Sequence, residues 1–121
     1  MKPHINDSMF GKITVGNMVY HHDIYIDLDG QIKKRKKKLS KKVYGTSHII
    51  SLEEIQHIYE EGVNLIIIGT GQYSRARLSP EAEAYLKTKK CSVKQLSTEN
   101  AVETWNSMKP SKTIALFHVT C

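Results

Sequence analysis

The chain has 121 residues, 40% of them hydrophobic and 25% charged, which fits a single globular domain spanning 1–121. No apolar run approaches the ~20 residues of a membrane span, and residues 1–10 contain no hydrophobic stretch typical of a secretory signal. Two cysteines do not make a disulfide framework, so we expect a cytoplasmic protein without a membrane association.

The net charge of +6 arises in one short segment. Eight of the 18 lysines and arginines lie between Lys33 and Lys42, so the rest of the chain holds ten basic residues against 12 acidic ones. The body of the domain is therefore slightly acidic, and residues 33–47 form a distinct basic segment.

The first third of the chain has the pattern of antiparallel hairpins. Residues 1–10 are expected to be a loose lead-in. Residues 12–15 and 18–20 flank the turn Gly16-Asn17, and a strand at 24–26 returns after Asp29-Gly30. The basic segment that follows is expected to be a loop or an extension of the sheet edge.

From Ser51 onward the sequence predicts alternating helices and strands. Ser51 and Glu54 form a capping-box pattern for a helix that Gly62 ends, and Ser79-Pro80 begins a second helix. A third helix is capped by Ser97 or Thr98, with Pro110 after it. Apolar strands are expected at 63–68, 93–96 and 113–119. The predicted fold is a three-layer α/β/α arrangement with a mixed central sheet and N-terminal antiparallel hairpins.

Ligands of open α/β sheets bind beyond the carboxyl ends of the strands. The loop Gly69-Thr70-Gly71 ends one predicted strand, and two helix N-termini, which favour anions, are expected at the same edge if the strands are parallel. The candidate ligand-binding residues are Thr46, His48, Gly69, Thr70, Gly71, Gln72, Arg75, Thr98, Asn106 and His118.

The Gly-Thr-Gly loop departs from known phosphate-binding motifs. A dinucleotide fingerprint has a third glycine where this chain has Ser74, and its helix begins at once rather than near Ser79. The acidic ribose partner of that fingerprint and the lysine of a P-loop are also missing. Two interpretations remain, a ligand cradle and a sharp turn that glycine permits after a buried strand.

The basic segment is the candidate nucleic-acid contact. Its candidate residues are Lys33, Lys34, Arg35, Lys36, Lys37 and Lys38. Because it lacks interleaved aromatic residues and any known nucleic-acid-binding motif, a solvated basic edge is the simpler interpretation. The histidines and cysteines have no metal-ligand spacing, so we expect neither a metal nor another cofactor.

Several short motifs, taken in order, resemble one small α/β family. They are Phe10-Gly11-Lys12-Ile13, Gly45-Thr46-x-His48, Ile68-Gly69-Thr70-Gly71, Thr98-x-x-Ala101, Asn106 and Phe117-His118-x-Thr120-Cys121. That family includes an adipogenesis-associated domain protein, a mitochondrial respiratory complex I assembly factor and short archaeal homologues of unknown function, and the stretch Lys41–His48 is most similar to the archaeal branch. The resemblance implies a three-layer α/β/α fold but supplies no catalytic residues.

Three functions are therefore compared. The first is a non-catalytic domain that binds a small anion or assembles with a protein partner at the strand ends around Gly69–Gly71. The second is an enzyme that uses His48 or His118, with Thr98 or Cys121, at the same edge; a buried, hydrogen-bonded structural histidine is the simpler interpretation of either residue. The third is non-specific nucleic-acid binding through Lys33–Lys42.

Overall fold

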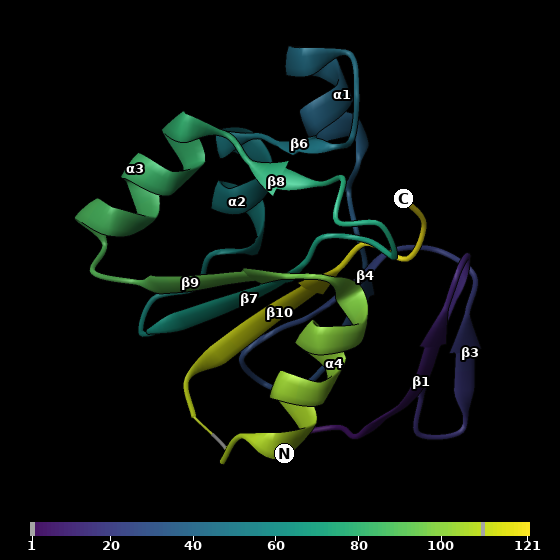
Figure 1. Ribbon diagram of the computed structural model, residues 1–121. Coiled ribbons are helices and arrows are strands. Elements are labelled where there is room, and N and C mark those ends of the chain that lie inside the picture. The colour runs from purple at the N-terminus through teal and green to yellow at the C-terminus, as the bar shows by residue number, and fades with distance from the viewer. Residues whose placement is uncertain (1, 110) are drawn as a thin grey trace.

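The computed structural model describes residues 2–109 and 111–121. A five-stranded mixed sheet occupies its centre (Figure 1). In spatial order its strands are β5 (Ile32–Lys34), β4 (Ile24–Ile26), β10 (Thr113–Phe117), β7 (Leu65–Gly69) and β9 (Ser92–Leu96). The strands β10, β7 and β9 are parallel, whereas β4 pairs antiparallel with β10 and β5 pairs antiparallel with β4.

Alternating residues of β7 divide the core into two clusters. Ile66 and Ile68 pack with α2 (Leu52–Ile58) and α3 (Pro80–Thr88), whereas Ile67 packs on the opposite face. That opposite face is covered by α4 (Thr98–Ser107) and by a small sheet of β1 (Ile5–Met9), β2 (Lys12–Val15) and β3 (Met18–Tyr20) (Figure 1). The predicted α/β/α layering is confirmed, with the third layer shared between one helix and the hairpin sheet.

The prediction of a loose lead-in over residues 1–10 is wrong for its second half. Residues 5–9 form β1, which pairs antiparallel with β2. The side chain of Asn106 fixes the start of this strand, because it accepts from the Ile5 N–H at 3.0 Å and donates to the Ile5 carbonyl at 2.7 Å. This anchor is more than 100 residues away in the chain, so local sequence patterns could not indicate it.

The basic segment is not a loop along its length. Residues 38–44 form α1 (Lys38–Tyr44), which ends at Gly45 with a φ of 72° in the left-handed region. Ser40 of this helix is fully buried, so one side of α1 packs against the body of the domain. After it, β6 (Ile49–Ile50) pairs parallel with β8 (Arg77–Leu78).

The predicted helix starts are confirmed. The hydroxyls of Ser51, Ser79 and Ser97 each accept a hydrogen bond from the backbone N–H three residues later. The observed boundaries of other helices and strands differ more from the predicted ones. Helix α2 stops at Ile58, well before Gly62, and β7 begins two residues after the predicted start. Pro110, expected to follow α4, lies outside the described residues. Within those residues, no helix is long and apolar enough to cross a membrane.

Candidate functional site

The carboxyl edge of the parallel strands also receives residues from the first third of the chain. Because β4 runs antiparallel to β10, the residue before β4, Asp23, lies at the carboxyl end of β10. Because β5 runs antiparallel to β4, Arg35, which follows β5, reaches the same edge. The strand ends predicted from the sequence therefore meet two charged residues that the sequence analysis did not place there.

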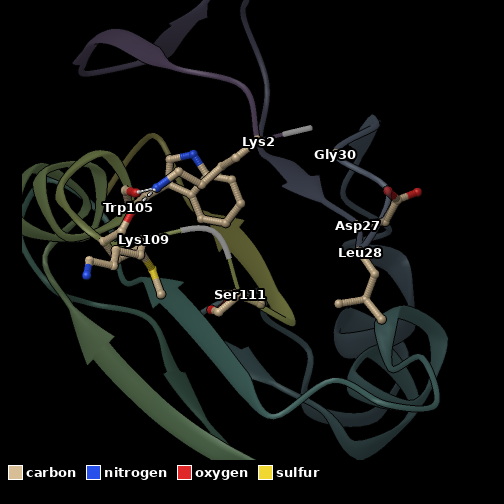
Figure 2. A pocket seen from close by; sticks show the side chains of 9 residues that line it. Lys2, Asp27, Leu28, Gly30, Trp105, Lys109 and Ser111 are labelled. Atoms are coloured by element: carbon tan, nitrogen blue, oxygen red, sulfur yellow. Dashed lines mark hydrogen bonds between the residues drawn. The ribbon is translucent and has the colours of Figure 1, made fainter.

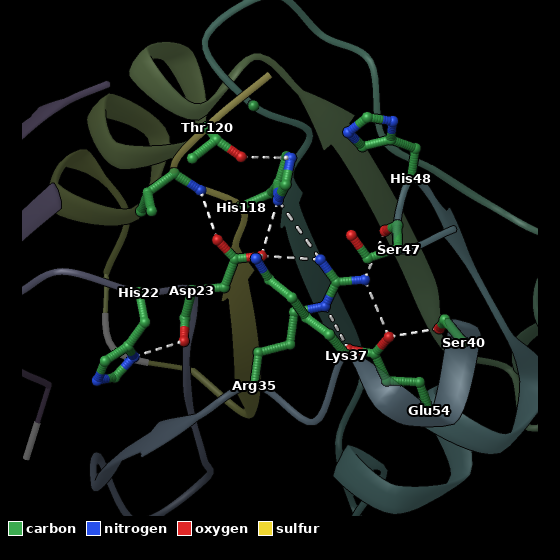
Figure 3. Close-up of polar contacts among 12 residues, drawn as sticks. His22, Asp23, Arg35, Lys37, Ser40, Ser47, His48, Glu54, His118 and Thr120 are labelled. Carbon is green, nitrogen blue, oxygen red and sulfur yellow. Dashed lines mark hydrogen bonds and ion pairs between the residues drawn. The ribbon is translucent and has the colours of Figure 1, made fainter. Parts of the chain in front are cut away.

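A buried ion-pair network lies at this edge (Figure 3). Arg35 Nε donates to Glu54 Oε2 at 2.6 Å and Arg35 Nη2 to Glu54 Oε1 at 3.0 Å, while Nη1 donates to Asp23 Oδ2 at 2.8 Å. The three residues are 3%, 0% and 1% exposed. Burying an isolated charge costs much free energy. Here each of the three charged groups has an oppositely charged partner in the network.

Glu54 has a different role from the one the capping-box pattern predicts. The Ser51 hydroxyl does accept from the Glu54 N–H at 3.1 Å, but the Glu54 carboxylate turns to Arg35 and to the Ser40 hydroxyl. The Ser51 N–H donates to Ser40 Oγ at 2.9 Å instead. Half of the capping box is thus present, and the other half is replaced by the buried network.

His118 joins the network through Asp23. Its Nδ1 lies 2.7 Å from Asp23 Oδ2, and the Val119 N–H donates to Asp23 Oδ1 at 2.8 Å. Burial by itself raises the pKa of Asp23, but the hydrogen bond and charge of His118, the Val119 N–H and Arg35 together hold that pKa well below its ordinary range. Asp23 is therefore an ionised carboxylate at neutral pH.

The two histidines predicted as site residues lie together. The rings of His48 and His118 meet edge to face with centroids 5.4 Å apart, and His118 Nε2 lies 3.3 Å from the Thr120 hydroxyl (Figure 3). Burial, followed by the positive charges of His118, Arg75, Arg35 and Lys37, lowers the pKa of His48. His118 itself is 1% exposed and hydrogen-bonded, as expected for a structural histidine.

The Gly-Thr-Gly loop uses its backbone amides within the chain. The N–H groups of Thr70, Gly71 and Gln72 donate to the Leu96 carbonyl, the Thr98 hydroxyl and the Thr120 carbonyl, respectively. A Cβ built on Gly71, whose φ is +110°, would lie 2.2 Å from the backbone of Cys121. These contacts favour the sharp-turn interpretation, because the amides that would cradle an anion already have acceptors.

The remaining candidate ligand-binding residues do not all lie in one place. Thr98 is fully buried and its hydroxyl donates to the His118 carbonyl, while Thr46 Oγ1 accepts from the His48 N–H at 3.1 Å. The Arg75 N–H donates to the Cys121 carbonyl at 3.1 Å, and the Arg75 residue is exposed. Asn106 holds β1 from the far end of α4 and does not join the group.

The basic segment lines a hollow beside the buried network. The hollow has a volume of about 530 Å³, and we refer to it as the basic hollow. It is lined by His22, Asp23, Lys34, Arg35, Lys36, Lys37 and Lys38. The Lys37 Nζ lies 3.6 Å from Asp23 Oδ2, so this lysine connects the hollow to the network.

Three of the six nucleic-acid candidates, Lys33, Arg35 and Lys37, form ion pairs with acidic residues. Arg35 belongs to the buried network, so its assignment as a solvent-facing contact is wrong. Lys33 pairs with Asp27 at 3.1 Å and is absent from the lining of the basic hollow. The exposed lysines that line the basic hollow are therefore Lys34, Lys36 and Lys38, while Lys37 is half-buried and pairs with Asp23.

A second hollow of about 190 Å³ includes Lys2, Asp27, Trp105 and Ser111 in its lining (Figure 2). The Lys2 ammonium donates to the carbonyls of Trp105 and Met108 at the end of α4. Its charge thus compensates unpaired carbonyls and the helix dipole, which is a structural role.

Sequence reasoning missed Asp23, Arg35 and Glu54 as one unit. The available signal was residue type: Arg35 is the single arginine in a run of lysines, and arginine is preferred where two parallel hydrogen bonds meet a buried carboxylate. Nothing local could reveal that its partners lie 12 and 19 residues away.

Comparison with known proteins gives a family and a fold. A model of a protein family of unknown function, DUF498/DUF598, matches residues 5–118. A conserved hypothetical protein from Pyrococcus horikoshii OT3 is 30% identical with a TM-score of 0.91, covering 97% of this chain and 98% of that one. The protein MT938 is also 30% identical, with a TM-score of 0.83 over 99% and 100% of the two chains. A Bordetella pertussis protein described as a Mth938-like domain has 15% identity and a TM-score of 0.63, with coverage of 97% and 85%.

Proposed function

The chain belongs to the DUF498/DUF598 family, and from that premise we propose that it binds a small, multiply charged anion in the basic hollow without transforming it. The lysines of the hollow attract the anion, and the buried network holds the floor of the hollow rigid. The proposal keeps the carboxyl edge of the sheet as the site but places the ligand over Asp23 and Arg35 rather than on the Gly69–Gly71 amides.

The charge balance of the lining is the observation that carries this proposal. Four lysines surround the hollow, and its lining contains one carboxylate, that of Asp23. That carboxylate is bonded to Arg35, His118 and the Val119 N–H, and it also pairs with Lys37 at 3.6 Å. Because four lysines outnumber this one carboxylate, the mouth of the hollow has a positive potential that concentrates anions.

The size and place of the hollow agree with this function. A volume of about 530 Å³ lies within the usual range of small-molecule sites, which is roughly 300–1,000 Å³. The floor is formed by groups that are less than 5% exposed and linked by short hydrogen bonds. A rigid floor lowers the entropic cost of ordering a site around a ligand.

Titration followed by NMR tests the proposal. Inorganic phosphate, pyrophosphate and citrate are added separately to the labelled protein, and the backbone amides of residues 34–38 are expected to shift together and to saturate. The triple variant Lys34→Gln, Lys36→Gln and Lys38→Gln should bind at least about tenfold more weakly, since it loses three phosphate contacts. The control, Lys87→Gln, Lys90→Gln and Lys94→Gln, removes three exposed charges from α3, the turn that follows it and β9, and should bind as the original chain does.

Three results contradict the proposal. They are the absence of saturable shifts at residues 34–38, equal weakening in both triple variants, and shifts confined to the Gly69–Gly71 loop. A mixed-sequence single-stranded oligonucleotide is titrated in a separate experiment. If the oligonucleotide binds with a steep salt dependence and pyrophosphate does not displace it, the nucleic-acid alternative replaces the proposal.

A second candidate function rests on the chain of contacts Asp23–His118–Thr120. A carboxylate bonded to one ring nitrogen and a hydroxyl near the other is the arrangement in which a histidine acts as general base. With an activated ester, Thr120 Oγ1 would attack the carbonyl carbon, its proton would pass to His118 Nε2, and the bond to the leaving alkoxide would break. Water would then hydrolyse the acyl–threonine ester.

The reagent p-nitrophenyl acetate tests this second candidate. Release of p-nitrophenolate together with an acetyl group on Thr120, found by mass spectrometry of the digested protein, supports it. The variant Thr120→Val should lose both, whereas Thr14→Val on β2 should keep both. Acetylation spread over lysines, with none on Thr120, contradicts it.

A further inference from the structure

The edge strands of the two larger sheets differ in charge. Strand β5 carries Lys33 and Lys34, and β9 carries Lys94 at its centre. Strand β3, the outer strand of the three-stranded sheet, consists of Met18, Val19 and Tyr20 and has no charged residue. Lysines on edge strands discourage pairing with another chain, so β3 is an edge that lacks this protection.

We propose that a second copy of this chain pairs with β3, antiparallel about a two-fold axis at Val19, and forms a dimer with a continuous six-stranded sheet. In Figure 1, β3 lies at the outer side of the molecule, and β2 is its one neighbour in the sheet. The proposal is independent of the basic hollow, which lies at the carboxyl edge of the other sheet.

The backbone of Val19 has the orientation that this pairing needs. Val15 and Met18 flank the two-residue turn Gly16-Asn17, which makes them a hydrogen-bonded pair in the hairpin. Hydrogen-bonding direction alternates along a strand, so the N–H and C=O of Val19 point to the free side. Two copies related by a two-fold axis at Val19 would each donate one N–H and accept one through these groups.

The side chains are self-complementary in the same arrangement. Val19, 45% exposed, would lie opposite Val19 of the second copy, and Met18, 59% exposed, would lie opposite Tyr20 of the second copy. Pairs of β-branched residues and contacts between a thioether and an aromatic ring are both stabilising across strands. Pairing thus covers two of the most exposed apolar side chains in the described residues.

The other edges oppose the same arrangement. A two-fold axis at Lys33 of β5 or at Lys94 of β9 would place two ammonium groups opposite each other, which is destabilising. At β1, the Asn106 side chain already bonds the N–H and C=O of Ile5. Because the contact uses the same strand of both copies, it closes at two and does not propagate into a fibre.

Sedimentation equilibrium over micromolar to millimolar concentrations tests the dimer. The wild-type chain should show a concentration-dependent monomer–dimer equilibrium, and the variant Val19→Lys should weaken it roughly tenfold or more. The matched control is Val43→Lys. Val43 lies on α1 and is 48% exposed, so the same new charge at a similar exposure should leave the equilibrium unchanged.

Hydrogen exchange gives a second measurement on the unaltered chain. Exchange of the Val19 amide should slow as the protein concentration rises, while the Lys94 amide on β9 should not change. A monomer at every concentration overturns the proposal. So does equal weakening by Val19→Lys and Val43→Lys, or a dimer in which the Val19 amide exchanges at the same rate as in the monomer.

Discussion

His118 Nδ1 and Asp23 Oδ2 are 2.7 Å apart, although 95 residues separate them in the chain. This contact ties the N-terminal hairpins to the end of the last strand. It also joins charges that are far apart in the chain: Asp23 and Glu54 both pair with Arg35, and His118 contacts Asp23 through its Nδ1. The structural core of the site is thus an electrostatic unit with parts from four regions of the sequence.

The first prediction concerns the contribution of Asp23 to stability at low pH. The folded-state pKa of Asp23 is below its unfolded value, which is about 3.9. The stabilisation from Asp23 is therefore fully present above that unfolded value, and it is lost as the pH falls below it toward the folded-state pKa. The Asp23 carboxyl carbon, followed by NMR, should show no titration step between pH 6 and 3. A full titration step for Asp23 near pH 4 would contradict the buried pairing.

The second prediction is that Arg35→Lys destabilises the fold although the charge is kept. Lysine cannot make the paired bonds to Glu54 and the bond to Asp23 at once, so at least one buried carboxylate loses its partner. We expect the free energy of unfolding in urea to fall by about 3 kcal/mol. The control Lys36→Arg, on an exposed residue, should change it by less than about 0.5 kcal/mol. Equal stability of both variants would refute the network's role.

The third prediction separates steric contact from backbone strain. Gly71 and Gly62 have φ values of +110° and +96°, but a Cβ on Gly71 would meet Cys121 at 2.2 Å and His118 at 2.9 Å, whereas Gly62 has open space. Both alanine variants suffer the unfavourable φ, and Gly71→Ala also suffers the clash. Thermal unfolding should show Gly71→Ala to be less stable than Gly62→Ala by about 2 kcal/mol. Equal melting temperatures for the two variants would contradict the prediction.

The fourth prediction tests the anchor of β1. Asn106→Ala leaves the N–H and C=O of Ile5 without their partners, which should cost about 2 kcal/mol and release the strand start. Exchange of the Ile5 amide should accelerate well beyond that of Ile13 on β2. Asn100→Ala on the exposed side of α4 is the control. An Ile5 amide that stays protected in Asn106→Ala would show that packing alone holds β1.

Local patterns were sufficient for most of the secondary structure. Serine caps at Ser51, Ser79 and Ser97 marked helix starts, and the turns Gly16-Asn17 and Asp29-Gly30 marked hairpins, because these signals act over three or four residues. The second half of the lead-in and the helix within the basic segment were missed, since β1 depends on Asn106 and α1 packs its buried Ser40 against Glu54 and Ser51.

The sequence by itself determined the layered α/β fold and indicated the carboxyl ends of the strands as the candidate site, because apolar periodicity, helix caps and turns are local patterns. Only the tertiary structure decided what that edge contains. Arg35 differs from its lysine neighbours in residue type, but its role is set only where Asp23, Glu54 and His118 surround it. The Gly69–Gly71 loop is a possible cradle until Thr98 and the C-terminal residues occupy its amides. Pairing of buried charges and amides depends on partners distant in the chain, and no local pattern encodes their meeting.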